Sequence, residues 1–494
     1  MRLRDRLRER PAIRGALIAG AGALAALVPA LFLYGFTVDD ALITARYAAH
    51  VARGHGYRFN VAGAVTDGVT PLGFPYLLAP FARGGPLAAL AAAKLLGLVA
   101  WTSASAVLAL AVDRADDGAD ERADERADDR AAPTRLRFTA LLLVALSAPL
   151  AAWSVAGMET GLALALGALA VALPELGAVH AGALCGGLTA ALRPEALPFA
   201  LVLAAAPSPR RARTTTLRVA LAALPFVAVV AVRLLVFGRA VPLAVLAKPS
   251  DATHGGMYAL ACFLVTGPLA LLAPLAWARL GGWGRGLVLA VLVHFGAVAL
   301  AGGDWMPLSR LVVPVLPAVV LAFARLAAVA HRLSTVARLA VALGLGVYFQ
   351  LAKVGPSAAR VGAARRAVIE ELRAPLAGAR VVAALDIGWL GAATDASLVD
   401  LAGLTDPVIA ALPGGHTSKA IPRGLLDARG VDALVLLLKD GEPLVTPWSD
   451  AFYARIVELR VASIPGIADA FAPVAESHVP HLAYVVLRRV PAAP

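Results

Sequence analysis

Two adjacent carboxylates, Asp39 and Asp40, stand directly after an apolar run that begins near Ala16. About twenty apolar residues span a bilayer, so the acidic pair is expected where a helix leaves the membrane. A carboxylate there is costly unless it faces a watery cavity, which makes the pair a candidate functional site. The alternative is structural, because Thr37 or Asp39 could cap a helix over residues 41–52. We favour function, since one Asp would suffice as a cap.

Paired carboxylates suit two kinds of chemistry. One of them can take a proton from a hydroxyl as a general base, and partial burial raises the pKa of such a carboxyl. The pair could also hold a hard divalent cation. None of the nine histidines falls in a His-Glu-x-x-His or comparable spacing, so the sequence implies no metal and no other cofactor.

The composition indicates a membrane protein that crosses the bilayer many times. Of 494 residues, 60% are hydrophobic and 16% are charged, which is too apolar for a soluble protein. The net charge of +12 comes from short basic clusters between apolar runs, as cytoplasmic loops show, and these clusters form no basic face for nucleic acid. Cys185 and Cys262 both fall in apolar stretches, so no disulfide is expected.

The apolar runs predict about eleven transmembrane helices. With the basic residues between Arg2 and Arg14 in the cytoplasm, the first run is an uncleaved anchor that leads outward. The predicted spans lie near residues 16–36, 86–112, 138–153, 159–174, 176–193, 196–206, 217–236, 257–277, 286–301, 310–330 and 336–351.

This topology defines two domains. Residues 1–351 form the membrane domain, with a first external loop at 37–85 and a charged, low-complexity cytoplasmic loop at 113–137. Residues 352–494 read as an extracytoplasmic α/β domain, with buried strands separated by helices near 358–374 and 449–460. The expected strands are 380–386, 397–401, 431–438 and 484–488.

Several polar motifs recur in one order along the chain. They comprise Asp39-Asp-Ala-x-Ile-x-x-Arg-Tyr47, Gly54-x-Gly56, Asn60, Asp67-Gly-x-Thr-Pro-Leu72, Gly157-Met-Glu-Thr160, Arg193-Pro-Glu195, Lys248, Gly303-Asp-Trp-Met-Pro307 with Arg310, Asp386-Ile-Gly388 and Asp400-Leu-Ala-Gly-Leu-Thr-Asp-Pro407. The motifs that precede the α/β domain are all predicted on the external face. In this order they resemble the GT-C class of integral-membrane glycosyltransferases, most closely the family of the mycobacterial terminal arabinofuranosyltransferase. Three departures concern the substrate region: Asp67 stands for a usual Glu, Gly73 for an aromatic residue, and Pro242-Leu-Ala-Val for a Pro-Asn-Thr-like segment.

The resemblance implies an inverting glycosyltransferase on the outer side of the cytoplasmic membrane. It would move a sugar, arabinofuranose in the family that it resembles, from a polyprenyl-phosphate donor to an envelope glycan or lipid. Asp39 or Asp40 would be the catalytic base, and cations should converge on the leaving phosphate. The predicted substrate-binding residues are Arg46, Tyr47, Asn60, Asp67, Thr70, Glu159, Arg193, Glu195, Lys248, Asp304 and Arg310, and Arg239 is a further candidate cation.

Two other functions fit the composition. A non-catalytic envelope assembly protein would use the external α/β domain and would tolerate loss of the Asp39 carboxylate. A transporter or flippase tends to carry charged or broken spans at the midplane and two related halves. The polar motifs gather at one face and no internal repeat is present, which argues against transport.

Overall fold

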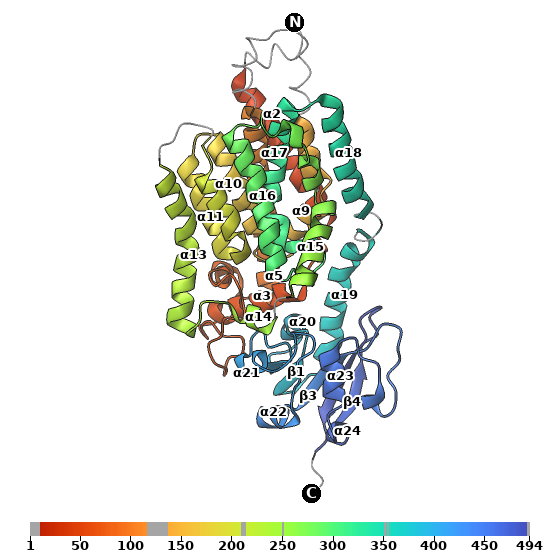
Figure 1. Ribbon diagram of the computed structural model, residues 1–494. Helices are drawn as coiled ribbons and strands as arrows, with labels where there is room; N and C mark the ends of the chain where they lie inside the picture. The colour runs from red at the N-terminus through yellow and green to blue at the C-terminus, as the bar shows by residue number, and fades with distance from the viewer. Residues whose placement is uncertain are drawn as a thin grey trace, which may run out of the picture. The chain divides into compact units, whose positions relative to one another are not determined.

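The computed structural model describes residues 10–115, 137–208, 214–248, 251–349, 352 and 355–491 (Figure 1). The chain forms two compact units, each assembled from three separate segments. The first unit consists of Met1–Phe36, Lys94–Val229 and Ser250–Ala359, and the second of Thr37–Ala93, Val230–Pro249 and Arg360–Pro494. Apart from its ends, the charged loop predicted at 113–137 lies outside the described residues, as do residues 1–9, which precede the predicted N-terminal anchor.

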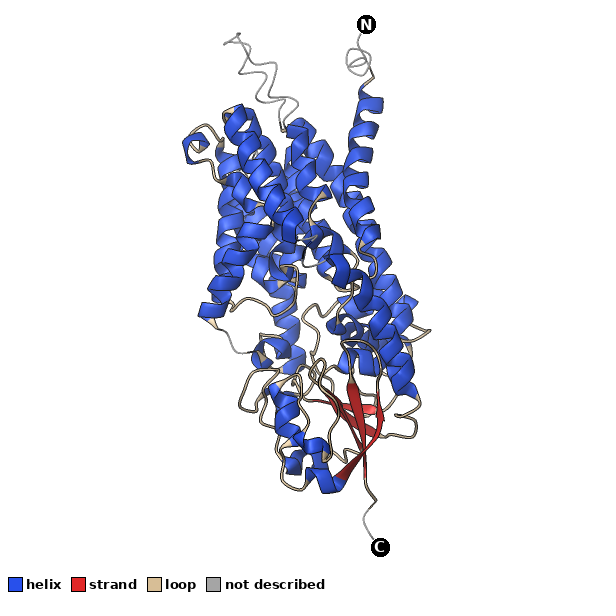
Figure 2. Cartoon of the chain, turned by 90° about the vertical axis from the view of Figure 1, so that its right-hand side faces the viewer, coloured by secondary structure: helices blue, strands red, loops and turns tan. Residues whose placement is uncertain are grey.

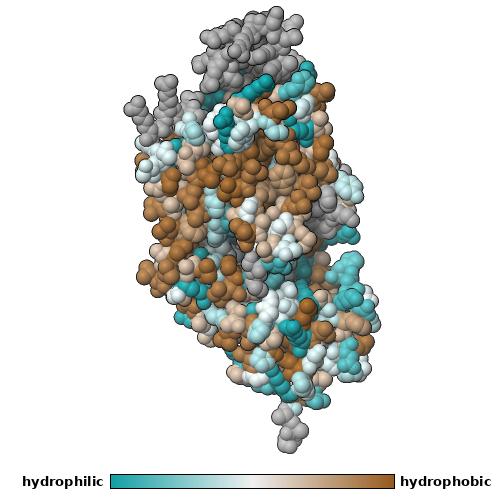
Figure 3. All heavy atoms as spheres, in the orientation of Figure 1, coloured by the Kyte–Doolittle hydropathy of each residue, from teal (hydrophilic) through white to brown (hydrophobic). Residues whose placement is uncertain are grey.

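Within the described residues, five helices are long and apolar enough to cross a membrane. They are α2 (Pro11–Phe32), α5 (Pro86–Arg114), α13 (Thr215–Phe237), α16 (Gly282–Leu300) and the segment Arg310–Val329, which contains α17 (Leu316–Val329). Four shorter apolar helices accompany them: Thr160–Glu175 (α10), Val179–Leu192 (α11), Pro194–Ala205 and Ala252–Val265 (α15). Figure 3 shows hydrophobic residues over much of the visible face of the helical part, as expected of a membrane-embedded protein. The count of eleven spans stays a prediction.

Proline interrupts two of the predicted spans. The span near 138–153 consists of the short helices Arg137–Leu141 (η3), Leu142–Ala145 (α8) and Ala148–Ser154 (α9), and Pro149 lies at the start of the last. The span near 257–277 ends its α-helix at Val265, and short turns begin at Pro268 and Pro274. Proline has no N–H donor and clashes with the preceding turn, which explains both interruptions.

Helices of the first unit approach one another closely where they carry glycine. A methyl group at Gly167 of α10 would lie 1.9 Å from the Pro314 carbonyl oxygen, and one at Gly97 of α5 would lie 2.2 Å from the Ser154 carbonyl oxygen. Small residues at such contacts let helix backbones pack directly, which is common in membrane proteins.

The second unit contains a five-stranded mixed sheet in the order β2-β1-β3-β5-β4. Its strands are drawn in red in Figure 2. The strands are β1 (Val381–Ala384), β2 (Ser397–Asp400), β3 (Ala433–Leu437), β4 (Phe471–Glu476) and β5 (Tyr484–Arg489). β1 pairs in parallel with β2 and β3, while β5 is antiparallel to β3 and to β4. The four predicted strands are confirmed. β4 was not predicted, because only one of its six residues is buried and it contains Pro473, both typical of an edge strand.

Among the described residues, eight helices of four or more residues lie wholly within the second unit. They are α3 (Asp39–Ala52), α4 (Phe74–Leu78), α14 (Leu243–Ala247), α20 (Ile387–Ala393), α21 (Pro407–Ala410), α22 (Arg423–Ala428), α23 (Ile456–Ala462) and α24 (Ile467–Ala470). The helices α5, α13 and α19 (Gly355–Arg373) each lie partly in this unit. The helix predicted near 449–460 begins only at Ile456, after a 3-10 turn over Trp448–Asp450.

The first predicted external loop shares one hydrophobic core with the C-terminal sheet. Ile43, Tyr47 and Phe59 are buried in the same cluster as Ile387 and Leu398. The compact units therefore follow a different division from the predicted boundary at residue 351, because residues far apart in the chain bury their apolar side chains together.

Candidate functional site

The Asp39 carboxylate binds the N-terminus of a helix that lies 350 residues further along the chain. Its Oδ2 accepts a hydrogen bond from the Gly388 N–H at 3.0 Å, and its Oδ1 accepts one from the Trp389 N–H at 2.7 Å. These are the second and third residues of α20, whose N–H groups a capping side chain normally satisfies. The structural alternative for this pair, a cap of the helix over residues 41–52, is not observed: α3 has Val38 at its N-cap and no side-chain capping bond.

The cap residue of α20 itself, Asp386, is engaged elsewhere. Its Oδ2 accepts a hydrogen bond from Arg455 Nη2 at 2.7 Å and another from the Tyr484 hydroxyl, and Arg365 Nη1 lies 4.0 Å away. Arg365 in turn donates to the Tyr484 hydroxyl at 2.6 Å. Asp386 makes no side-chain capping bond to α20, and Asp39 caps the helix in its place. The Asp386 carboxylate, in contrast, lies beside the guanidinium groups of Arg365 and Arg455.

This arrangement gives the two carboxyls opposite pKa shifts. Burial raises the pKa of Asp39 to about 8, and the negative charges of Asp386 and Asp40 add to the rise against the two N–H bonds. Burial also disfavours ionisation of Asp386, but the Arg455 and Arg365 charges outweigh it and lower the pKa of that group. A carboxyl with a raised pKa beside an ionised one is the pattern expected of a general base.

Gly388 makes this contact sterically feasible. A methyl group at position 388 would lie 2.0 Å from the Asp39 carbonyl oxygen and 2.8 Å from its Oδ1. Any side chain there would push α3 away from α20 and break the capping bonds. The Asp-x-Gly spacing of residues 386–388 therefore serves the contact with Asp39.

Arg46 holds backbone segments together. Its Nε donates to the Phe59 carbonyl at 3.0 Å, and its terminal nitrogens donate to the carbonyls of Gly391, Thr394 and Ala396 at 2.8–3.1 Å. Four of its five N–H donors are used in this way. Arg46 therefore has a structural role in the second unit, and one N–H remains for the predicted contact with phosphate.

Asn60 pairs with the outer edge of β2. Its side-chain oxygen accepts from the Leu398 N–H and its amide nitrogen donates to the Leu398 carbonyl, both at 2.9 Å. Because β2 is an edge strand, the amide takes the place of a neighbouring strand at that residue.

Replacement of Asn60 by Ala should lower the free energy of unfolding of the second unit by about 1–3 kcal/mol, since two backbone groups lose their partners. Thermal or denaturant unfolding of the full chain measures this. Asn60→Asp is the matched variant, because it keeps the acceptor and removes only the donor. Equal stability of wild type and Asn60→Ala would contradict the assigned role.

Tyr47 and Asp67 are buried and hydrogen-bonded inside the same unit. The Tyr47 hydroxyl contacts Thr66 Oγ1 at 2.8 Å, and burial raises the pKa of this phenol above its ordinary value. The Asp67 carboxylate is shared by two guanidinium groups, with Arg233 Nε 3.3 Å from Oδ2 and Arg239 Nη2 against Oδ1. Arg233 also donates to the Thr70 carbonyl, so the Thr70 backbone, not its hydroxyl, makes the contact.

The remaining predicted site residues belong to the first unit, except Lys248, which follows α14 and is half-buried in the second. Arg193 is buried between two carboxylates, with Nη1 3.0 Å from Glu159 Oε1 and Nη2 2.7 Å from Glu195 Oε1. Arg310 Nε lies 2.6 Å from Asp304 Oδ2. Each of these two turns therefore holds an ion pair between an arginine and a nearby carboxylate.

The turn between Asp304 and Arg310 carries backbone strain. Leu308 and Ser309 both have left-handed backbones, with φ of 61° and 57°, although neither is glycine. The Leu308 carbonyl accepts a hydrogen bond from Trp153 Nε1 at 3.0 Å, which holds the turn in place. Strained non-glycine residues cluster at functional sites, so this turn is a candidate site of the first unit.

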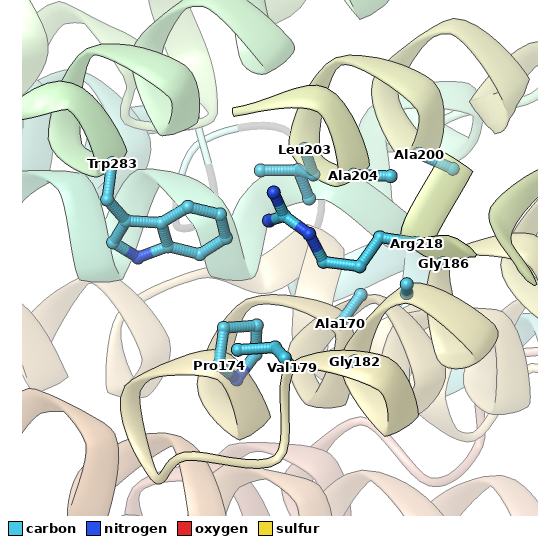
Figure 4. Close-up of a pocket in the computed structure, with 11 residues that line it drawn as sticks. Ala170, Pro174, Val179, Gly182, Gly186, Ala200, Leu203, Ala204, Arg218 and Trp283 are labelled. Atoms are coloured by element: carbon cyan, nitrogen blue, oxygen red, sulfur yellow. The ribbon is translucent and has the colours of Figure 1, made fainter. Parts of the chain in front are cut away.

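A small cavity in the first unit is not a ligand site. Pro174, Gly182, Arg218 and Trp283 are among its lining residues (Figure 4), and its volume of about 10 Å³ has room for one water at most. Arg218 donates to the Ala206 carbonyl at 3.0 Å, so it helps to hold neighbouring helices.

The predicted site residues thus form two groups, and four important partners were missed. Asp39, Asp40, Arg46, Tyr47, Asn60, Asp67, Thr70 and Lys248 lie in the second unit, and Glu159, Arg193, Glu195, Asp304 and Arg310 in the first. Sequence reasoning missed Arg233, Arg365, Arg455 and Tyr484, which pair with Asp67 or Asp386. Two features of the sequence indicate such partners. Arg233 is a charged residue within an apolar helix, and Asp386 follows a buried strand, so each is expected to have a partner of opposite charge.

Comparison with known proteins yields one partial match. Residues 358–477 match a family model described as "Domain of unknown function (DUF8728)". The matched segment includes Asp386, Gly388 and Arg455 but ends before β5, which lies between β3 and β4 in the sheet. No curated protein and no solved structure matches the chain. The family description names no function, so the functional argument depends on the residues themselves.

Proposed function

We propose that this chain is an integral-membrane inverting glycosyltransferase in which Asp39 is the general base. The observation that carries the proposal is the Asp39 carboxyl, held by two backbone N–H groups, with its pKa raised to about 8. A base is most effective when its pKa is near the working pH. The order of sequence motifs and the five helices apolar enough to cross a membrane support the same proposal.

In the proposed step, the acceptor hydroxyl oxygen forms a bond to the anomeric carbon while the bond from that carbon to the phosphate oxygen breaks. The hydroxyl proton passes to Asp39, and the bonding electron pair leaves with the phosphate. Attack from the opposite face inverts the anomeric centre. Guanidinium groups would stabilise the departing charge. Arg365 and Arg455 are suited to this role in the second unit, because they already stand beside Asp386 and Arg365 also interacts electrostatically with Asp39.

The proposal includes a donor, an acceptor and a location. The donor is a polyprenyl-phosphate sugar, and the acceptor is an envelope glycan or lipid. The active side is the outer face of the cytoplasmic membrane, with the N-terminus in the cytoplasm and about eleven spans in all. The proposal includes no cofactor, and a divalent cation on Asp39 and Asp40 is compatible with it.

Envelope glycans of a strain that lacks the protein provide the first test. Mass spectrometry should find glycans that lack one terminal sugar, and the mass difference identifies that sugar. Expression of the wild-type chain should restore it, while Asp39→Asn should not. Unchanged glycans in the deletion strain would reject the transferase.

The pH profile should show the titration of Asp39. Only the ionised carboxylate can accept a proton, so kcat/KM should rise with pH and level off above about 8. The facing groups are Asp40 on α3, Asp386 beside α20 and Arg365 on α19. Asp386→Asn removes a neighbouring negative charge, so it should lower the pKa of Asp39 and move the rising limb to lower pH. A limb that does not move would exclude Asp39 as the titrating base.

The same pKa shift affects folding. Because the folded-state pKa of Asp39 is raised from 3.8 to about 8, the stability it contributes is complete below pH 3.8 and is lost as the pH rises through about 8. Activity and stability should therefore respond to pH in opposite directions at this residue.

A non-catalytic assembly protein is the second candidate. It is favoured by the structural bonds of Arg46 and Asn60, which hold the first loop to the C-terminal sheet. Such a protein would tolerate Asp39→Asn as long as the two units fold, which separates it from the transferase.

A further inference from the structure

A cavity of about 580 Å³ opens in the second unit, between α14, α21 and the loop that follows α21. This volume is within the range of small-molecule binding sites. Its lining combines apolar side chains, among them Leu243, Leu246 and Leu412, with the cationic Arg239 and Lys419. None of the described residues that line it is acidic, so its lining carries only positive charge.

Lys419 is a buried cation whose charge has no anionic partner among the described residues. Its side chain is 2% exposed, and Nζ donates to the carbonyls of Ala410 at 2.8 Å and Leu412 at 3.0 Å. These bonds use two of its three N–H donors and leave the positive charge uncompensated. Burial lowers the pKa of the Lys419 ammonium, because the charged form loses contact with water. An anion in the cavity would supply the missing charge.

Arg239 adds a second cation with donor capacity to spare. It shares the Asp67 carboxylate with Arg233, so two guanidinium groups face one carboxylate. Its Nε is buried and has no hydrogen-bond partner among the described residues. Together with Lys419, these groups leave an excess of positive charge around the cavity.

The apolar side of the cavity continues onto a surface suited to lipid. Arg239 stands two residues after the end of α13, a helix apolar enough to cross a membrane. Near that end Leu235 is 86% exposed, and Leu246, which lines the cavity, is 50% exposed. Such exposed leucines are expected where lipid covers the protein.

We propose that this cavity binds an anionic phospholipid, with the phosphate between Arg239 and Lys419 and the first part of the acyl chain against Leu243, Leu246 and Leu412. Arginine and lysine together are well suited to a phosphate group. This inference goes beyond the proposed transfer step, because the residues that line the cavity do not include Asp39. Free inorganic phosphate shares the same headgroup chemistry but would leave the apolar lining unoccupied.

Native mass spectrometry of the full chain tests this directly. In detergent, the wild type should retain phosphatidic acid in preference to phosphatidylcholine, and inorganic phosphate should not displace it. Lys419→Met and Arg239→Gln should each weaken retention about tenfold or more, since each removes a charge-assisted contact. Lys439→Met and Arg380→Gln, at exposed positions away from the cavity, are the matched controls and should bind like wild type.

Leu246→Glu tests the same site without replacing a buried side chain, so its effect is not confused with a loss of folding. Its half-exposed position should tolerate the change, while the added carboxylate repels the lipid phosphate and abolishes retention. Equal retention of phosphatidic acid by wild type, Lys419→Met and Leu246→Glu would overturn the proposal. Displacement by inorganic phosphate at the same concentration would also overturn it, because the site would then bind a free anion.

Discussion

Asp39→Asn is expected to lower the rate of sugar transfer by about 10²–10⁴-fold, the usual contribution of a general base. Asn can still accept one hydrogen bond from the N-terminus of α20 through its oxygen, so the fold should persist with a modest loss of stability. It cannot take the acceptor proton. The rate is measured with the purified full chain in a lipid nanodisc, from a polyprenyl-phosphate sugar to a glycan acceptor.

The control for this variant is Asp440→Asn, which changes an exposed carboxylate of the second unit. It should leave the rate unchanged. Thermal unfolding of both variants separates lost chemistry from lost folding. If Asp39→Asn transferred sugar at the wild-type rate, Asp39 would be only the cap of α20. If Asp40→Asn alone abolished transfer, the base would be the neighbouring carboxylate.

Arg193→Met is expected to have the largest effect on stability, a loss of about 3–5 kcal/mol in the free energy of unfolding, because it removes one partner of a buried ion cluster. Arg193 is 4% exposed and contacts both Glu159 and Glu195. Without it, two carboxylates face each other in the interior of the first unit. Thermal unfolding of the full chain in detergent measures the loss.

A combined variant distinguishes the charge from the packing of the Arg193 side chain. In Arg193→Met with Glu159→Gln and Glu195→Gln, no unpaired buried charge remains, so much of the stability should return. Arg332→Met, at an exposed position at the start of α18 (Arg332–Phe349), should have little effect. A stability of Arg193→Met close to wild type would show that the cluster is solvated or already neutral.

Features encoded locally in the sequence were predictable. The segments 381–384, 397–400, 433–437 and 484–489 form the predicted strands, because each contains consecutive buried aliphatic residues, as strands that are buried on both faces do. The helix after Asp39 was also predictable. In contrast, β4 has an exposed face and a proline, so its sequence resembles a loop.

Features that depend on distant pairing were not predictable from one sequence. The bond between Asp39 and Trp389 joins residues 350 positions apart, and Arg46 reaches Ala396 over the same separation. The residues that neighbour these positions in the sequence do not indicate such a contact. The sequence predicts that the motif residues of the first loop bind substrate, and in the structure Asp39, Arg46 and Asn60 bind backbone groups between residues 388 and 398. The steric demand at Gly388 is a similar case, since only the folded structure shows what a side chain there would meet.

Asp386 follows the strand β1 and Asp400 ends the strand β2, and from the sequence each is compatible with a sugar-acceptor site or with a structural turn. At Asp400 the structure favours the turn, because its carboxylate accepts the N–H groups of Ala402, Gly403 and Thr405. At Asp386 the contacts with Arg455 and Tyr484 go beyond a turn and connect this residue to Asp39. Asp39, which caps α20 beside the charged cluster around Asp386, is therefore the most relevant residue for the proposed sugar transfer.

Direct observation of the reaction tests the central claim. The purified full chain in a nanodisc is mixed with a polyprenyl-phosphate sugar and an acceptor glycan, above and below pH 8, and the products are followed by mass spectrometry. The proposal predicts one added sugar per acceptor, an equal amount of free polyprenyl phosphate, and neither product with Asp39→Asn. Folded wild-type protein that releases neither product with any sugar donor would contradict it.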